Sequence, residues 1–138
     1  MANITFTMIK PEAVESGYSG AILSRIESEG FRIVALKKIH LSAERAGEFY
    51  LIHKDHPFYA ELVAYMSSGP IIAAILEKNN AVLDFRSLIG STNPAEAKEG
   101  TIRAEFAESL AKNAIHGSDS NENAIIESDF HFSKSEMF

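Results

Sequence analysis

The sequence predicts an α+β fold of the ferredoxin-like βαββαβ type, with an antiparallel four-stranded sheet covered by helices. Three observations lead to this prediction. The chain has 138 residues, a length that suits a single domain over residues 1–138. Short segments of alternating apolar residues are separated by segments of helical period. No linker, internal repeat or low-complexity stretch divides the chain.

The first third of the chain passes from strand to helix and back. Residues 3–9 are predicted to form a strand, because their apolar side chains alternate with polar or smaller ones. Pro11 stops this strand, since proline cannot donate a ladder hydrogen bond. Residues 19–30 have a helical period, and Gly30 is suited to close the helix. Residues 31–40 return to strand character.

A pair of helices and a third strand are predicted next. Ser42 can cap the N-terminus of a helix that reaches about Ile52. Pro57 suits the first turn of a second helix, where its missing N–H costs little. Gly69-Pro70 breaks that helix, and residues 70–76 have the length and apolar character of a buried strand.

A further helix, a loop and another helix follow. Asn79 or Asn80 can cap a helix that Gly90 ends. Residues 90–100 are predicted to be a loop, because they combine glycine, asparagine and proline with small polar residues. Thr101 can cap a helix whose apolar positions extend to Leu110.

The end of the chain is predicted to hold a short helix and the last strand. Asp119 and Glu122 have the spacing of a capping box, for a helix that runs to about Glu127. Phe130 and Phe132 alternate as in a strand. The resulting order is βαββαβ with insertions, an arrangement that supports many functions and names none of them.

Composition narrows the class of protein. The net charge of −6 disfavours a general nucleic-acid binder, although a pocket can be locally positive on an acidic protein. The absence of cysteine excludes thiolate catalysis and cysteine zinc sites and is compatible with the cytoplasm, the expected location. Residues 1–8 lack a secretory signal, and no apolar run approaches the ~20 residues that span a bilayer.

The segment Asn-Ala-Ile-His-Gly-Ser-Asp-Ser, residues 113–120, is the most informative for chemistry. Free N–H groups at a helix start attract anions, and the neutral imidazole of His116 is a usable nucleophile. Glu127 follows eleven residues later and could fold back to hold the second ring nitrogen. The alternative is a loop histidine beside an N-cap, and a short motif alone does not decide between the two.

The longer string resembles the active-site signature of nucleoside diphosphate kinases. Other segments resemble landmarks of the same family, in the family's order. They are residues 5–14 with the Lys-Pro turn, residues 53–59, residues 68–70, and the two ends of a long loop at residues 90–95 and 100–103. The resemblance extends to about Phe132.

This resemblance implies a role for each matching residue on the phosphate side. His116 would accept the phosphoryl group on Nδ1, with Glu127 bonded to the other ring nitrogen. The residues that would line the ribose and the reacting phosphate are Lys10, Tyr50 and Asn113. The residues that would hold the outer phosphates are Arg86, Thr92 and Arg103. Ser118 and Asp119 would flank the site, and Ser120 is expected to bond Glu127.

The resemblance also implies a base slot and a reaction. Phe58 would stack on the base, with Leu62 and Leu110 completing an apolar slot. The implied reaction moves the γ-phosphoryl group of a nucleoside triphosphate to a nucleoside diphosphate by a ping-pong mechanism, with broad base tolerance. Mg²⁺ would bridge the phosphates and reach the protein through water, with no direct protein ligand. A homo-oligomer, tetramer or hexamer, is expected.

Physical chemistry supports these residue types independently. Phosphoryl transfer depends mainly on positioning and on neutralising charge, which three cations and a metal supply. Aromatic stacking does not read base identity. Taken singly, each of these residues also has an ordinary structural explanation: a strand-end lysine, solvated helix arginines and apolar side chains of a core stripe.

Two other functional classes are considered and disfavoured by the sequence. A non-catalytic ferredoxin-like nucleotide- or RNA-binding module would need exposed aromatics and a basic sheet. A relative that has lost activity would lack parts of the catalytic set. The chain also departs from the family: His56 stands where many members carry Arg, Ser91 where many carry Ala, and Glu99 where many carry Pro. The four remaining histidines show no metal spacing and are interpreted as structural or exposed.

Overall fold

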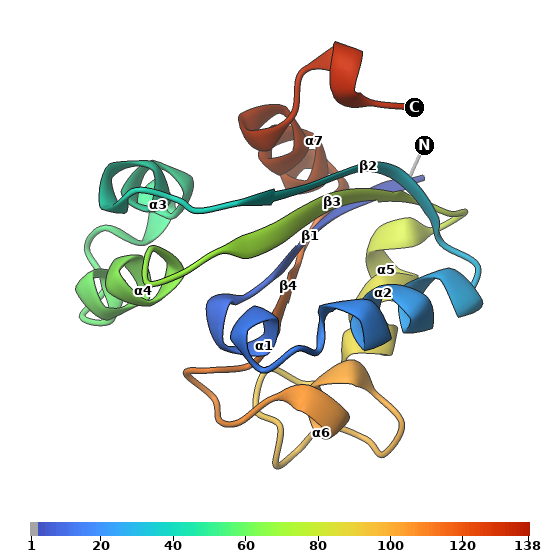
Figure 1. The fold of residues 1–138 in the computed structure, drawn as a ribbon, viewed down its shortest axis with the longest axis horizontal. Helices are drawn as coiled ribbons and strands as arrows, with labels where there is room; N and C mark the ends of the chain where they lie inside the picture. Colours follow the sequence, from blue (N-terminus) through green and yellow to red (C-terminus); the bar gives the residue numbers. More distant parts are fainter. Residues whose placement is uncertain (1–2) are drawn as a thin grey trace.

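The computed structural model describes residues 3–138. It is built around a four-stranded antiparallel sheet (Figure 1). The first two residues of the predicted 1–138 domain lie outside this range. The strand order is β2-β3-β1-β4. The strands are β1 Ile4–Ile9, β2 Arg32–Ile39, β3 Ile71–Glu77 and β4 Ile115–Gly117.

Seven α-helices and two 3₁₀ turns connect or follow the strands within the described range. The helices are α1 Pro11–Glu15, α2 Ser19–Ser28, α3 Ala43–Phe49, α4 Tyr59–Met66, α5 Ala81–Ile89, α6 Ile102–Phe106 and α7 Asn121–His131, and the 3₁₀ turns are Leu51–His53 and Lys134–Glu136. The series β1, α2, β2, β3, α5, β4 is the predicted βαββαβ skeleton, so the ferredoxin-like prediction is confirmed.

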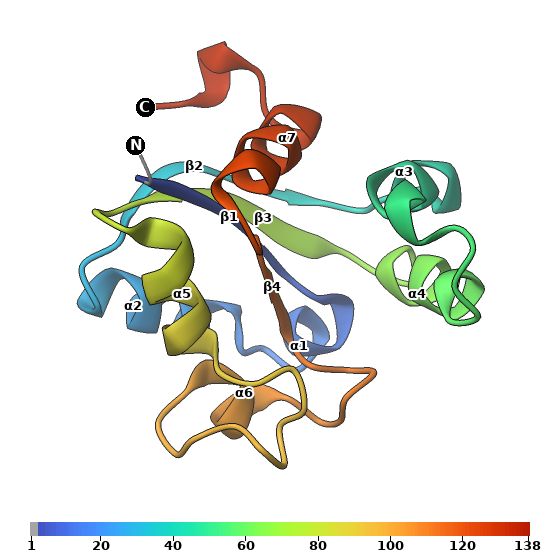
Figure 2. The same cartoon turned by 180° about the vertical axis from the view of Figure 1, so that it is seen from behind.

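Helices cover both faces of the sheet, and the two central strands, β1 and β3, are buried along almost their whole length. Figures 1 and 2 show α2 and α5 on one face and α7 on the other. On β1, the fully buried Phe6 and Met8 belong to the apolar cluster that includes Phe132, whereas Ile9 belongs to the cluster of α2 and α5. Burial of such side chains contributes ~1.5–3 kcal/mol each, which fixes the register of the central strand.

Two of the predicted helix caps are present as hydrogen bonds. The Ser42 hydroxyl accepts from the Arg45 N–H at 3.1 Å, and the Thr101 hydroxyl accepts from the Ala104 N–H at 3.3 Å. Asn80 precedes α5 in a left-handed conformation, with φ of 58°, and its side chain makes no cap bond. No helix among residues 3–138 is long and apolar enough to cross a membrane.

The prediction of the last strand was wrong. It assigned a strand to Phe130 and Phe132, whereas Phe130 lies in α7, which continues to His131. The buried positions Ala124, Ser128 and His131 follow a helical spacing of four and three, and this spacing outweighs the two alternating phenylalanines.

The true last strand, β4, carries His116 and was not predicted. It has three residues, too few for alternation to show in the sequence. The helix that follows is capped by Ser120, which accepts from the Asn123 N–H at 3.1 Å, and not by Asp119. His116 therefore lies in a strand before the helix and not at the helix start.

Two helix starts also differ from the prediction. Pro11 ends β1 as expected, but it is also the first residue of the short helix α1. Proline is favoured there because its φ is already helical and its missing N–H needs no partner. Helix α4 begins at Tyr59, with Phe58 as its N-cap residue, two residues after the predicted start at Pro57.

His131 is a buried titratable group that makes the fold sensitive to acid. Its ring stacks on Phe6 with centroids 5.0 Å apart, and its Nε2 has no hydrogen-bond partner. Burial, assisted by the nearby Arg45 and Lys37, lowers the pKa of His131 to about 4. An unpaired buried imidazole resists protonation because the cation would lose its hydration.

We expect the free energy of unfolding to fall as the pH drops from about 6.5 to about 4. In this range His131 binds a proton in the unfolded chain but not in the folded one. His131→Phe keeps the stacked ring and removes this contribution, which amounts to at most ~3 kcal/mol. Urea unfolding at several pH values measures it. The free energy of unfolding of the variant minus that of the parent should increase toward pH 4. A difference that does not change with pH would contradict the lowered pKa of His131.

Candidate active site

Backbone pairing and close packing hold His116 in place. His116 lies opposite Met8 in the antiparallel pairing of β4 with β1. The next residue, Gly117, touches α5 so closely that an added Cβ would lie 3.0 Å from the side chains of both Ile89 and Phe85. Only glycine lets α5 approach the strand this closely, and α5 is the helix that carries Arg86.

A carboxylate from α7 orients the imidazole. His116 Nε2 lies 2.9 Å from Glu127 Oε1, and the two side chains are 19% and 18% exposed. The Ser118 hydroxyl donates to the same carboxylate oxygen at 2.7 Å. With Nε2–H donating to Glu127, the other nitrogen, Nδ1, keeps its lone pair for an electrophile.

The hydroxyl that contacts Glu127 is not the expected one. Ser120 was expected to bond Glu127, but its oxygen caps α7 instead. Ser118 makes this contact and also accepts from the buried Phe6 N–H at 3.1 Å, so it connects β1 to the carboxylate. Asp119 is exposed and accepts from the Asn123 side chain at 2.6 Å.

Lys10 is a buried cation bonded to a neutral partner. Its side chain is 7% exposed, and Nζ donates to Asn113 Oδ1 at 2.7 Å. Burial and the charge of Arg103 lower the pKa of Lys10 to about 8. Ala114, with a φ of 72°, turns the chain here, and its carbonyl accepts from the Lys10 N–H at 2.8 Å. Such a conformation costs ~1–3 kcal/mol for a residue other than glycine.

Arg86, Thr92 and Arg103 line one cleft of about 570 Å³, together with Gly90 and Thr101. Arg103 is 8% exposed and donates to the carbonyls of Gly90 at 3.1 Å and Ile115 at 2.7 Å, while its Nε has no partner.

The electrostatics of this cleft favour an anion. Burial and the neighbouring Arg86 lower the pKa of Arg103 to about 10. A guanidinium whose charged state is disfavoured by burial and by a neighbouring cation is stabilised when negative charge enters beside it. Because Arg103 also bonds the carbonyl of Ile115, the residue before His116, the cleft is fixed relative to the imidazole.

Tyr50 ends α3 and is buried, with 7% exposure and a hydroxyl that has no hydrogen-bond partner. Burial raises the pKa of this phenol, and the charge of Glu127 raises it further. Tyr50 is therefore a neutral hydroxyl with an unused donor, close enough to Glu127 to experience its charge.

The predicted base-slot residues come from two separate segments. Phe58, which precedes α4, is 46% exposed, and Leu110, between α6 and β4, is 57% exposed. Leu62 is half-buried and packs with the apolar cluster around Met66. One side of the Phe58 ring faces His56, with centroids 4.9 Å apart and planes inclined by 16°.

Sequence reasoning missed the aromatic surroundings of the imidazole. The ring of Phe49 lies 5.8 Å from that of His116, and Phe6 lies 6.1 Å from it. Both rings also pack against His131, at 5.1 Å and 5.0 Å. In the sequence, the apolar spacing around Phe6 and Phe49 indicated only that these side chains are buried, and not that they surround a histidine. Nothing in the sequence indicates that Phe49 of α3 and Glu127 of α7 both contact one histidine.

Comparisons with known proteins agree over nearly the whole chain. A family model described as nucleoside diphosphate kinase matches residues 3–137. A nucleoside diphosphate kinase of Flavobacterium psychrophilum is 58% identical over 136 residues, which is 99% of this chain and 98% of the relative. One from Campylobacter lari is 57% identical over 133 residues, covering 96% and 97% of the two chains.

Solved structures agree in fold as well. The Aquifex aeolicus nucleoside diphosphate kinase superimposes with a TM-score of 0.95 at 46% identity, covering 98% of each chain. A halophilic nucleoside diphosphate kinase from Halobacterium salinarum in complex with CDP has a TM-score of 0.95 at 35% identity, covering 100% of this chain and 92% of that one.

Gly90 provides a test of how the cleft is built. Its φ is +86°, and an added Cβ would lie 2.5 Å from Thr101 Oγ1. We expect Gly90→Ala to displace Thr101 and the carbonyl that Arg103 bonds, costing ~1–3 kcal/mol beyond the backbone strain.

Gly100→Ala is the matched control, because its φ is +89° and no atom lies within 4 Å of the added Cβ. Urea unfolding measures the loss of stability in both variants. Both losses include the backbone strain of a positive φ, so the additional loss in Gly90→Ala reports the steric contact with Thr101. Equal losses of stability would show that the contact with Thr101 is unimportant.

Proposed function

The chain belongs to the nucleoside diphosphate kinase family, and on that premise we propose that the phosphoryl group passes through His116. The family's reaction transfers the γ-phosphoryl group of a nucleoside triphosphate to a nucleoside diphosphate, and the chain is a phosphotransferase of this kind. The non-catalytic binding module is not favoured. The observation that supports this role of His116 is its hydrogen bond to Glu127. With Nε2 as the donor in this bond, Nδ1 is left without a proton.

The proposed reaction has two half-reactions at one site. The Nδ1 lone pair attacks the γ-phosphorus, the bond from that phosphorus to the β-phosphate oxygen breaks, and the diphosphate leaves. The phosphorylated imidazole keeps its Nε2 proton, and the Glu127 carboxylate stabilises the positive charge spread over the ring. A second diphosphate then attacks the phosphorus through its terminal oxygen, and the P–N bond breaks to restore neutral His116.

The cations provide charge neutralisation. A phosphate beside one cation gains ~4 kcal/mol gross at an effective dielectric near 20, before desolvation. We propose that Arg86, Arg103 and Thr92 hold the outer phosphates, since they share one cleft. Lys10 and Asn113 are proposed to hold the ribose and the transferred group, and the unpartnered Tyr50 hydroxyl is proposed to donate to a phosphate oxygen.

Magnesium is proposed to enter with the nucleotide. Mg²⁺ prefers one or two carboxylates together with phosphate oxygens and water. The donor set here fits, because exposed Asp119 follows His116 by three residues and offers a single carboxylate. When bound, the ion would neutralise phosphate charge. Asp119 would contact the ion only through water molecules, so the ion would have no direct protein ligand.

Assembly and location complete the proposal. We propose a homo-oligomer, a tetramer or hexamer, of one-domain subunits working in the cytoplasm. β2 and β4 are the outer strands of the sheet, and an open strand edge can pair with another chain. Exposed apolar side chains, such as Leu36 on β2, add contact surface. Light scattering at micromolar concentration tests the assembly, and a monomer would exclude it.

The phosphohistidine is tested by labelling with γ-labelled ATP in the absence of acceptor. The protein should become labelled, and added diphosphate should remove the label, because one site serves donor and acceptor in turn. The bond should be labile to acid and stable to base, as a phosphoramidate is. His116→Ala should abolish both steps.

Two variants sharpen this test. Glu127→Ala should slow labelling and leave some of it, because Glu127 orients the ring without bonding the phosphorus. Ser118→Ala is expected to slow labelling less, since the hydroxyl reaches the imidazole only through the carboxylate, and to cost some stability because the buried Phe6 N–H loses an acceptor. Label on the His116→Ala protein, or acid-stable label on a serine, would show that another residue is the nucleophile.

The base slot predicts broad base tolerance, because stacking on Phe58 does not read base edges. The CDP bound to the Halobacterium salinarum relative supports acceptance of pyrimidines. Phe58→Ala should weaken nucleotide binding by ~1–3 kcal/mol with chemistry preserved, and Phe58→Tyr should keep most of the affinity. The test compares kcat/KM across bases. A roughly hundredfold preference, about 2.7 kcal/mol, would refute the slot as described.

A further inference from the structure

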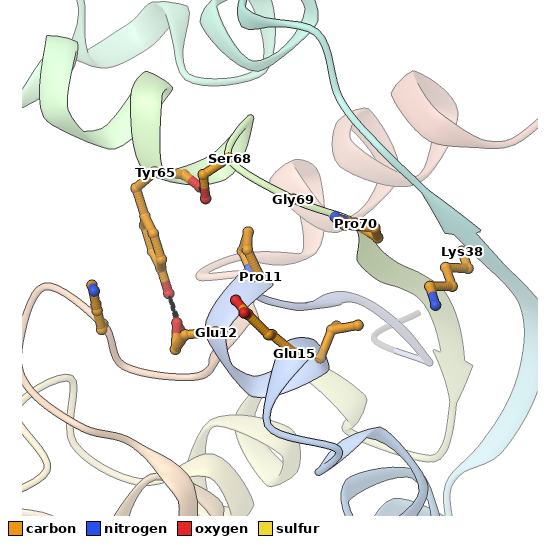
Figure 3. Close-up of a pocket in the computed structure, with 10 residues that line it drawn as sticks. Pro11, Glu12, Glu15, Lys38, Tyr65, Ser68, Gly69 and Pro70 are labelled. Atoms are coloured by element: carbon orange, nitrogen blue, oxygen red, sulfur yellow. Dashed lines mark hydrogen bonds between the residues drawn. The ribbon is translucent and has the colours of Figure 1, made fainter.

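A tyrosine and a glutamate meet beside the catalytic lysine, in a groove that the proposed mechanism does not use. The groove has a volume of about 480 Å³ and lies between α1, α4 and the start of β3 (Figure 3). Figure 3 shows the Tyr65 side chain reaching from α4 to Glu12 on α1. The Tyr65 hydroxyl donates to both carboxylate oxygens of Glu12.

Lys10 is the third member of this cluster. Its Nζ lies 5.8 Å from the centroid of the Tyr65 ring and donates to Asn113 at 2.7 Å. Two charged groups act on the pKa of Lys10: Arg103 lowers it and Glu12 raises it. Glu12 is therefore the carboxylate whose position governs how much negative charge the buried ammonium experiences.

A buried ammonium and a nearby carboxylate attract each other strongly. Water screens this attraction only weakly at a buried site. The observed arrangement is different: Lys10 bonds a neutral amide, and Glu12 bonds a neutral phenol. Burial and the hydrogen bond to Glu12 raise the pKa of Tyr65, so the phenol keeps its proton and remains a donor.

We infer that Tyr65 is a positioning residue that holds Glu12 away from Lys10 and so keeps the lysine ammonium available to a nucleotide phosphate. The inference rests on the proposed role of Lys10 as a phosphate contact. A lysine already paired with a carboxylate would have to break that pair before it could bind a phosphate, and nucleotide affinity would fall.

The test begins with Tyr65→Phe, which keeps the ring and removes the donor. Released Glu12 should pair with Lys10, and the KM for nucleotide should rise roughly threefold to tenfold, the scale of a partly exposed ion pair, with kcat largely kept. Tyr59→Phe is the matched control. It removes a phenol from the same helix whose hydroxyl donates to the Gly47 carbonyl at 2.9 Å, and it should leave KM unchanged.

The double variant separates restraint of Glu12 from simple bracing of α4. Glu12→Gln removes the competing charge, so Tyr65→Phe should have no further effect in that background. Gln at position 12 can still accept the hydrogen bond from the Tyr65 hydroxyl. If Tyr65 merely braces α4 against α1, Tyr65→Phe would therefore raise KM in the Glu12→Gln background as much as in the parent. That result would overturn the inference.

A direct readout on Lys10 makes the test independent of catalysis. NMR titration of its ε-methylene signal reports the Lys10 pKa in the free protein. The pKa should rise in Tyr65→Phe as Glu12 approaches and fall in Glu12→Gln. An unchanged pKa in Tyr65→Phe overturns the inference and means that Glu12 has found another partner, such as Lys38 or Lys112 in the same groove. A raised pKa with unchanged KM supports the restraint of Glu12 and refutes Lys10 as a phosphate contact.

Discussion

The hydrogen bond between His116 and Glu127 is the interaction on which the rest of the site depends. It joins the last strand of the sheet to helix α7, which covers one face of that sheet, so the imidazole orientation is tied to the packing of the whole domain. Ser118 adds a bond to the same carboxylate and another to β1. Held by a sheet and a helix, His116 as the proposed nucleophile would lose little entropy when a substrate arrives, which is the advantage of building a site on rigid elements.

Unpaired positive charge is the second constraint. Lys10 and Arg103 are buried, bond neutral partners, and have pKa values lowered by burial and by neighbouring cations. Such groups destabilise the folded chain in the absence of an anion and stabilise it when phosphate binds. The same principle explains why acceptors around Lys10 must be neutral or restrained: a mobile carboxylate would satisfy the cation before the substrate could.

Some of this site could be read from single residues, and some could not. The segment around His116 indicated a nucleophile, and the acidic residue eleven positions later indicated its partner, because both residue types are required by the chemistry. Ser120 was predicted to be the hydroxyl that bonds Glu127, whereas Ser118 makes this contact; both are hydroxyls within one short polar segment, so the sequence does not distinguish them. The strand that carries His116 was missed because three residues show no period, and the false strand at Phe130 shows that two alternating aromatics are weak evidence.

The sequence by itself indicated the fold class, the first three strands, two helix caps and the proposed reacting groups, because these depend on local periodicity, on side-chain chemistry within a few residues and on the family resemblance that those residues carry. Only the tertiary structure decided which groups meet. Arg103 reaches the carbonyl beside His116, Lys10 meets Asn113 across 103 residues of chain, and Tyr65 meets Glu12 across 53. These contacts depend on how helices pack on the sheet, and packing joins residues that no local pattern in the chain relates.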